Sequence, residues 1–84
     1  MIYYLIICRS LTYAQRSAKA LERAGITATV LKTPQNIAAE GCGYSVKVPI
    51  NRLNNAVLTL KKVSLDPRRI FEAYDNGEYI EVPT

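Results

Sequence analysis

The chain has 84 residues, of which 49% are hydrophobic and 21% charged, and its formal net charge is +4. This length suits a single domain over residues 1–84, and the composition is that of a folded globular protein rather than a disordered one. The sequence contains no histidine, which excludes histidine-based acid–base catalysis, histidine metal ligands and a cysteine–histidine dyad within this chain. Two cysteines are too few for the disulfide framework of a small secreted domain.

The N-terminal apolar run Ile2–Cys8 is too short to span a bilayer and lacks the charged start and long apolar core of a signal peptide. We therefore expect a cytoplasmic protein with no membrane partner. The basic residues are spread along the chain, and Lys61-Lys62 and Arg68-Arg69 are the only adjacent pairs. This spread is typical of a solvated surface rather than of a dedicated nucleic-acid binder.

The chain opens with a strand signal that changes to a helix signal. The β-branched and aromatic run Ile2–Cys8 predicts a strand that is buried on both faces. Apolar residues then recur at helical spacing over residues 11–25. We expect this helix to begin with a capping box formed by Thr12 and Gln15 and to end at Gly25.

The middle of the chain contains two predicted strands and a long connection. Residues 26–31 combine β-branched and small residues, as expected of a second strand, and residues 32–43 form the connection. Residues 44–48 alternate large apolar residues with Ser45 and Lys47. This alternation predicts a half-exposed third strand with the two polar side chains in solvent.

A second helix and a hairpin complete the predicted elements. A stripe of apolar residues at helical spacing follows Asn51, the expected N-cap, and ends near Val63. Residues 69–74 predict a fourth strand. The Asn-Gly dipeptide at 76–77 predicts a two-residue hairpin turn into a fifth strand over residues 78–82.

This order predicts an α+β fold, a ferredoxin-like split βαβ sandwich (βαββαβ) whose extra C-terminal strand forms a hairpin. Right-handed crossovers place the first and third strands side by side and antiparallel, with both helices on one sheet face. Cys8 ends the first strand and Cys42 immediately precedes the third, so we expect both at one sheet edge. A disulfide would need their Cα atoms within about 4.4–6.8 Å of each other. For Cys8 a small buried apolar residue is the favoured interpretation, and a dithiol site is the alternative.

Cys42 has a different environment because it lies between Gly41 and Gly43. The flanking glycines leave its sulfur sterically open and let backbone N–H groups turn towards it. Such donors, together with a cation such as Arg9 or Lys47, would stabilise a thiolate and lower the pKa of the Cys42 thiol. The alternative is a tight loop that needs glycine and holds a cysteine by chance.

Four segments carry a family resemblance: Tyr3–Ile6 at the start, Ala24–Ile26 at the end of the first helix, Pro34 in the connection and Cys42–Val48. In this pattern the chain resembles the small bacterial selenium/sulfur carrier protein-like family. The resemblance implies that Cys42 accepts sulfur or selenium from a donor protein, holds it as a persulfide or perselenide, and passes it to an acceptor protein. It implies a protein-binding carrier with no cofactor and no turnover of its own, rather than an enzyme.

Two other functions are compatible with the expected strand order. One is a regulatory or protein-interaction domain, a homodimeric ferredoxin-like module without covalent chemistry, because such sheets commonly pair edge to edge. The other is RNA binding, in which aromatic residues of the two central strands stack on bases. Tyr3 and Tyr44 occupy those strands, but the basic-glycine-aromatic string of that fold is absent from the sequence, so nucleic acid is not the expected partner.

Two further classes of site lack their residues in this sequence. Two cysteines, no histidine and scattered carboxylates do not supply a zinc site within one chain. The Gly-Cys-Gly string at 41–43 lacks the third glycine and the following helix of a phosphate-binding or dinucleotide motif.

Overall fold

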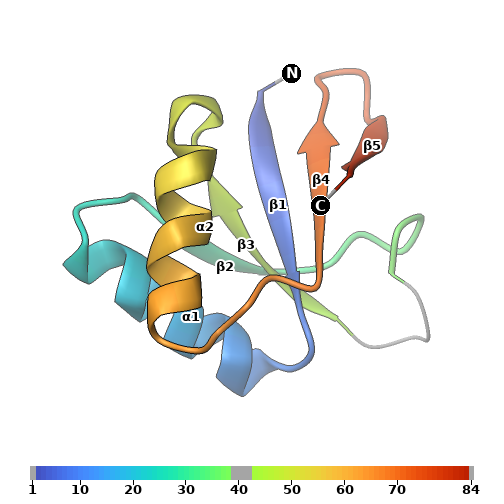
Figure 1. Cartoon of the computed structure of the whole chain (residues 1–84). Coiled ribbons are helices and arrows are strands. Elements are labelled where there is room, and N and C mark those ends of the chain that lie inside the picture. The colour runs from blue at the N-terminus through green and yellow to red at the C-terminus, as the bar shows by residue number, and fades with distance from the viewer. Residues whose placement is uncertain (1, 39–42, 84) are drawn as a thin grey trace.

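A computed structural model describes residues 2–38 and 43–83 (Figure 1). These residues form an α+β domain with two helices and an antiparallel sheet in the strand order β2-β3-β1-β4-β5. In chain order the elements are β1 (Tyr3–Cys8), α1 (Leu11–Arg23), β2 (Thr29–Lys32), β3 (Tyr44–Val48), a 3₁₀ helix (Ile50–Arg52), α2 (Leu53–Lys62), β4 (Arg69–Ala73) and β5 (Tyr79–Val82). In the described part of the chain, the helices are too short or too polar to cross a membrane.

β1 lies at the centre of the sheet, between β3 and β4. Cys8 at the end of β1 pairs with Tyr44 at the start of β3, and Leu5 pairs with Phe71 of β4. The prediction that the first and third strands are antiparallel neighbours is therefore confirmed. This register places the end of β1 directly beside the residue that follows Gly43.

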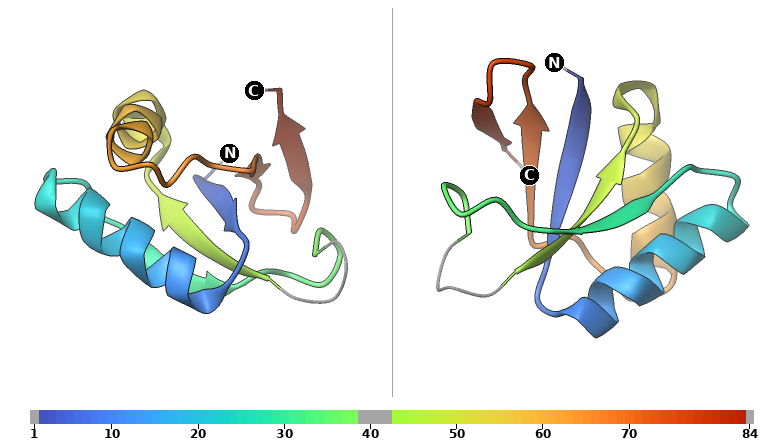
Figure 2. Two further views of the ribbon diagram at one scale, coloured as in Figure 1. Left: turned by 60° about the horizontal axis from the view of Figure 1, so that its bottom comes forward. Right: turned by 180° about the vertical axis from the view of Figure 1, so that it is seen from behind.

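Both helices cover the same face of the sheet (Figure 2, left). Apolar side chains from α1, α2 and this sheet face form one core cluster: Ile6, Ala14, Ala18, Leu21, Ile26, Val46, Val48, Ala56, Leu60, Leu65 and Ile70. Complete burial of a leucine or isoleucine side chain contributes about 1.5–3 kcal/mol, so this cluster is the main source of stability.

The opposite face of the sheet is also partly buried, as the apolar character of the first strand predicted. Leu5, Phe71 and Ala73 lie on this face, because side chains alternate along a strand, and they are 0%, 5% and 1% exposed. Ser45 lies on the same face and is fully buried, so the prediction that it faces solvent is wrong. Its hydroxyl forms a hydrogen bond with that of Thr33, which is also buried, so both polar groups are satisfied. Residues 33–38, which follow β2, lie on this side of the sheet (Figure 2, left).

β2 begins at Thr29, three residues later than predicted, because Ile26 completes the end of α1. Gly25 has a φ of +80°, and the Ile26 N–H donates a hydrogen bond of 2.9 Å to the Leu21 carbonyl. This is a Schellman ending, in which the residue after the glycine returns to the helix and packs against it. Ile26 accordingly lies in the core cluster, and the predicted helix end at Gly25 is confirmed.

Both predicted helix N-caps are wrong. α1 begins at Leu11, and its cap is Ser10, whose hydroxyl accepts a hydrogen bond of 3.2 Å from the Tyr13 N–H instead of a capping box at Thr12. Asn51 lies inside the 3₁₀ helix, and Arg52 occupies the N-cap position of α2 without a side-chain cap. Because the 3₁₀ helix precedes α2, α2 begins only at Leu53, and Asn51 lies one residue too early to be its N-cap.

The turn between β4 and β5 contains three residues rather than the predicted two. The Tyr74 N–H donates to the Glu78 carbonyl at 2.9 Å, and the Gly77 N–H donates to the Tyr74 carbonyl at 3.1 Å. Gly77 has a φ of +87°, and the Asn76 side chain accepts a hydrogen bond of 3.0 Å from the Glu78 N–H. These features define a turn followed by a left-handed glycine, the usual three-residue hairpin loop. The predicted fifth strand is confirmed as β5.

α2 ends in the same way as α1, but with Ser64 at the left-handed position, at a φ of 62°. The Leu65 N–H donates to the Leu60 carbonyl at 2.9 Å, which completes the Schellman ending. We expect Ser64→Gly to raise the free energy of unfolding by about 0.5–1 kcal/mol, because glycine adopts this backbone conformation without a Cβ penalty. Urea denaturation measures the change, and Gly25→Ala should produce the opposite sign. A lower stability of Ser64→Gly would contradict this explanation.

Candidate functional site

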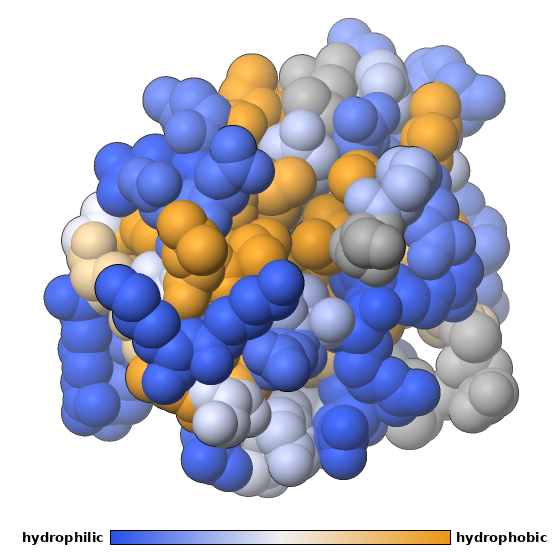
Figure 3. All heavy atoms as spheres, viewed as in Figure 1, coloured by the Kyte–Doolittle hydropathy of each residue, from blue (hydrophilic) through white to orange (hydrophobic). Residues whose placement is uncertain are grey.

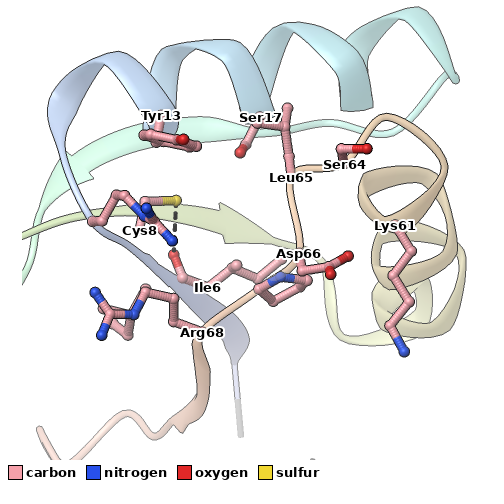
Figure 4. Close-up of a pocket in the computed structure, with 12 residues that line it drawn as sticks. Ile6, Cys8, Tyr13, Ser17, Lys61, Ser64, Leu65, Asp66 and Arg68 are labelled. Carbon is pink, nitrogen blue, oxygen red and sulfur yellow. Dashed lines mark hydrogen bonds between the residues drawn. The ribbon is translucent and has the colours of Figure 1, made fainter.

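A pocket of about 250 Å³ lies at the end of β1, between α1 and the connection from α2 to β4 (Figure 4). We call it the Cys8 pocket. One side of the pocket is formed by the end of β1 and by α1. Its lining residues are Cys8 of β1, Arg9 directly after it, and Tyr13 and Ser17 of α1. The other side is lined by Lys61 of α2 and by residues 64–68. The pocket thus combines segments that are more than 40 residues apart in the sequence.

The Cys8 thiol is half-buried in this pocket and is directed into the protein. Its Sγ donates a weak hydrogen bond of 3.7 Å to the Ile6 carbonyl oxygen. Burial raises the pKa of the Cys8 thiol, and hydrogen bonding with the Ser17 side chain lowers it by a smaller amount. Cys8 is therefore a neutral thiol at neutral pH, whereas a nucleophilic cysteine needs a thiolate.

This environment predicts the pH dependence of Cys8 alkylation. In a Cys42→Ser variant, in which Cys8 is the only thiol, the iodoacetamide rate should reach half its maximum at a higher pH in the folded protein than in the protein unfolded in urea. The pKa of the Cys8 thiol is higher in the folded protein than in the unfolded protein. The neutral thiol therefore stabilises the fold at pH values below the unfolded-state pKa, and this stabilisation is lost as the pH rises through the folded-state pKa. Equal midpoints in the folded and unfolded states would contradict the prediction.

Positive charge predominates in the lining of the Cys8 pocket. Three cations, Arg9, Lys61 and Arg68, and one carboxylate, Asp66, give a net lining charge of +2. The Arg9 guanidinium also stacks on the Tyr13 ring, with its Cζ 4.8 Å from the ring centroid. This cation–π contact holds the Arg9 side chain beside the pocket.

The predicted site residues fall into two groups. Cys42 and Gly41 lie outside the described residues, so their predicted roles remain predictions. Gly43 is buried, and its carbonyl accepts a hydrogen bond of 2.9 Å from the Thr33 N–H. A Cβ at this position would lie 3.0 Å from the Thr33 Oγ1, so packing against Thr33 favours glycine.

Cys8 and Arg9 meet at the pocket, but Lys47 does not join them. Lys47 is exposed on the sheet face away from the helices, and its Nζ lies 4.8 Å from the centroid of the Tyr3 ring. Tyr44 packs against the core on the helix-covered face instead. Tyr3 and Tyr44 therefore lie on opposite faces and do not form one stacking platform for bases.

Sequence reasoning missed the side of the pocket formed by Lys61 and residues 64–68, and it gave Ser17 no role. The adjacent basic pairs at 61–62 and 68–69 were the only signal for these residues, and that signal does not indicate what they face. No three metal-ligating side chains come together within residues 2–38 and 43–83.

A second, apolar groove of about 540 Å³ lies between α2 and the β4–β5 hairpin. It is lined mainly by Leu53, Val57, Leu58, Ile70 and Val82. Apolar side chains gather between α2 and the neighbouring strands in the space-filling view (Figure 3). Lys61 and Pro67 line both this groove and the Cys8 pocket, so the two hollows are neighbours.

Comparison with protein families found a match over residues 3–72 to the family described as "Putative Se/S carrier protein-like". Comparisons with curated proteins and with solved structures found no match. The family match begins with β1 and extends into β4, so it includes both helices and the Cys8 pocket. The chain therefore belongs to the Se/S carrier protein-like family.

Proposed function

We propose that this protein is a thiol-based carrier of sulfur or selenium, and that Cys42 holds the chalcogen as a persulfide or perselenide. Family membership is the observation that carries the proposal. The family description names the role but not the residue. The choice of Cys42 follows from its position between Gly41 and Gly43 and from the properties of the other cysteine.

The chain has two cysteines, and the environment of Cys8 disfavours carrier chemistry. Its half-buried position raises the pKa of the thiol, and its Sγ is directed towards the Ile6 carbonyl. A carrier thiol must ionise and reach a partner protein, so Cys42 is the better candidate. Next to it in the sequence, Gly43 is anchored to Thr33, which supplies a fixed backbone position beside the reactive residue.

The loading step is a thiol–persulfide exchange with a donor protein. The Cys42 thiolate attacks the outer sulfur of a donor persulfide, the donor S–S bond breaks, and the donor cysteine leaves as a thiolate. One sulfur atom moves, and the total charge is unchanged. Unloading repeats the exchange with an acceptor protein, and both partners are expected in the cytoplasm.

Mass spectrometry of the intact protein tests the assignment. After incubation with a cysteine desulfurase and cysteine, the wild-type protein should gain about 32 Da, the mass of one persulfide sulfur. Cys8→Ser should load like the wild type, whereas Cys42→Ser should not load. If the wild type stays unloaded while alkylation shows that the Cys42 thiol is accessible, the proposal is wrong.

We also propose that the fold is a ferredoxin-like split βαβ sandwich extended by β5. The adjacent order β2-β3-β1-β4 and the placement of both helices on one face support this assignment. An experimental structure should show right-handed crossovers through α1 and α2. A left-handed crossover would exclude the ferredoxin-like class.

The apolar groove favours a second candidate, a protein-interaction module that does not use covalent chemistry. Leu58, which lines this groove, is 60% exposed, and large exposed apolar residues often mark contact surfaces. This candidate predicts a stable dimer and a Cys42→Ser variant that keeps its cellular function. Size-exclusion chromatography with light scattering checks the dimer, and a monomer at the highest soluble concentration would contradict it.

A further inference from the structure

We propose that the Cys8 pocket binds a small divalent oxyanion that carries one sulfur or selenium atom, of the chemical class of thiosulfate or monothiophosphate. The binding of an anion follows from the pocket itself. The preference for a sulfur- or selenium-bearing anion rests on the proposed carrier function as well. The proposal concerns reversible binding, and no bond forms or breaks.

The charge of the pocket favours a divalent anion. The cations Arg9, Lys61 and Arg68 exceed the single carboxylate Asp66 by two charges. Within the described ranges 2–38 and 43–83, the one salt bridge is Arg69–Glu81, which lies outside this pocket. A divalent oxyanion would balance the lining charge and accept charge-assisted hydrogen bonds from the guanidinium groups.

The inner wall of the pocket suits a soft atom better than an oxygen. It includes the sulfur of Cys8 and the side chains of Ile6 and Leu65, which are 0% and 8% exposed. An oxyanion oxygen placed against this wall would lose its hydration without enough donors to replace it. Sulfur and selenium are more weakly hydrated and more polarisable, so they would tolerate contact with this apolar wall.

Ser17 supplies one polar group at this inner wall. Its side chain is 3% exposed, and its hydroxyl points from α1 into the pocket towards Cys8 (Figure 4). The Ser17 hydroxyl hydrogen-bonds with the Cys8 sulfur, and rotation of this hydroxyl lets it donate instead to an anion bound beside Cys8. A neutral Cys8 thiol also allows an anion to bind nearby, whereas a thiolate would repel it.

The size of the pocket limits the ligand. Its volume of about 250 Å³ is smaller than the hollows that usually hold drug-sized ligands or nucleotides, about 300–1,000 Å³. A tetrahedral anion with a few bound waters fits this volume. The pocket is therefore suited to an inorganic anion rather than to a nucleotide or a peptide.

Amide chemical-shift titrations of the ¹⁵N-labelled full chain test the proposal with two matched probe pairs. Thiosulfate is compared with sulfate, and monothiophosphate with phosphate, so that each pair differs by one sulfur atom. The titrations use the Cys42→Ser variant, which excludes reaction at that thiol. Thiosulfate should shift the amides of residues 8–17 and 61–68 and bind about fivefold more tightly than sulfate.

Charge variants identify the binding site. Arg68→Gln and Arg9→Gln should each weaken thiosulfate binding about five- to tenfold, because each removes a charged donor from the pocket. Arg23→Gln makes the same charge change in the last turn of α1, outside the pocket lining, and should leave the affinity unchanged. Cys8→Ser should reduce the difference in binding affinity between thiosulfate and sulfate, because it replaces the polarisable sulfur of Cys8 by a hydroxyl.

Three results would overturn the proposal. No shift in these amides would exclude an anion site, and equal affinities within each probe pair would exclude the preference for sulfur. If Arg23→Gln and Arg68→Gln weaken thiosulfate binding equally, the anion is attracted nonspecifically to a basic protein rather than bound in the pocket. Failure of the carrier proposal is separate, because it appears as unloaded wild-type Cys42 in the mass spectra, whereas the anion titration uses a variant without that thiol.

Discussion

Replacing Leu60 by alanine is expected to lower the free energy of unfolding by about 3 kcal/mol. Leu60 lies in α2, is 0% exposed, and belongs to the core that both helices form against the sheet. The substitution removes buried apolar surface and leaves a cavity, because the close-packed surroundings relax only in part. A small domain has a total stability of about 5–10 kcal/mol, so this one change should remove roughly 30–60% of it.

Leu58 provides the matched control for this experiment. It lies in the same helix two residues earlier, but 60% of its surface is exposed. Leu58→Ala makes the same chemical change with nearly the same effect on helix propensity, and it should alter stability by less than about 0.5 kcal/mol. Urea denaturation of both variants, followed by circular dichroism, gives the two values. Equal losses would show that Leu60 is not a core residue.

The buried hydroxyl pair of Thr33 and Ser45 is expected to show the second large effect. Ser45→Ala should lower the free energy of unfolding by about 2 kcal/mol, because it leaves the Thr33 hydroxyl buried without its partner. Thr33→Val should have a similar effect for the converse reason. The double variant should lose less than the sum of the two single changes, since neither hydroxyl then remains unpaired.

A double-mutant cycle in urea measures this coupling, which should be about 1 kcal/mol. Thr29→Val is the control, because Thr29 is an exposed threonine of β2, and its replacement should change stability by less than about 0.5 kcal/mol. Additive losses in the Thr33–Ser45 cycle would contradict a direct hydrogen bond. The pair lies beside Gly43, so the same variants also test whether this packing affects the alkylation rate of Cys42.

The position of Lys61 and Pro67 has a consequence for partner binding. Both residues line the apolar groove as well as the Cys8 pocket, so a protein bound in the groove would lie beside the proposed anion site. If a donor or acceptor protein docks there, its binding and the binding of thiosulfate should affect each other. Thermodynamic linkage requires the two effects to be equal in size.

Local signals in the chain were sufficient for the order of the elements. Hydrophobic periodicity located both helices and the third strand, because a 3.6-residue or two-residue repeat reflects which face is buried. The Asn-Gly dipeptide at 76–77 located the fifth strand. Gly25 and Gly77 marked a helix end and a hairpin loop, since each occupies a left-handed conformation that glycine adopts without strain. The antiparallel neighbourhood of β1 and β3 followed from the element order and the handedness of crossovers.

Tertiary packing determined the features that depend on contacts between distant segments. Alternation along the third strand placed the Ser45 side chain on the other sheet face from that of Val46. The sequence pattern does not reveal whether this other face is covered, and in the structure Ser45 is fully buried there. The Cys8 pocket brings residues 8–17 close to residues 61–68, and a local sequence pattern contains no information about contacts between such distant segments. The pKa of the Cys8 thiol has the same origin, because desolvation depends on every segment that surrounds the sulfur. Local periodicity thus determines which face of each helix and strand is apolar, whereas the packing of distant segments determines the chemistry of the Cys8 pocket.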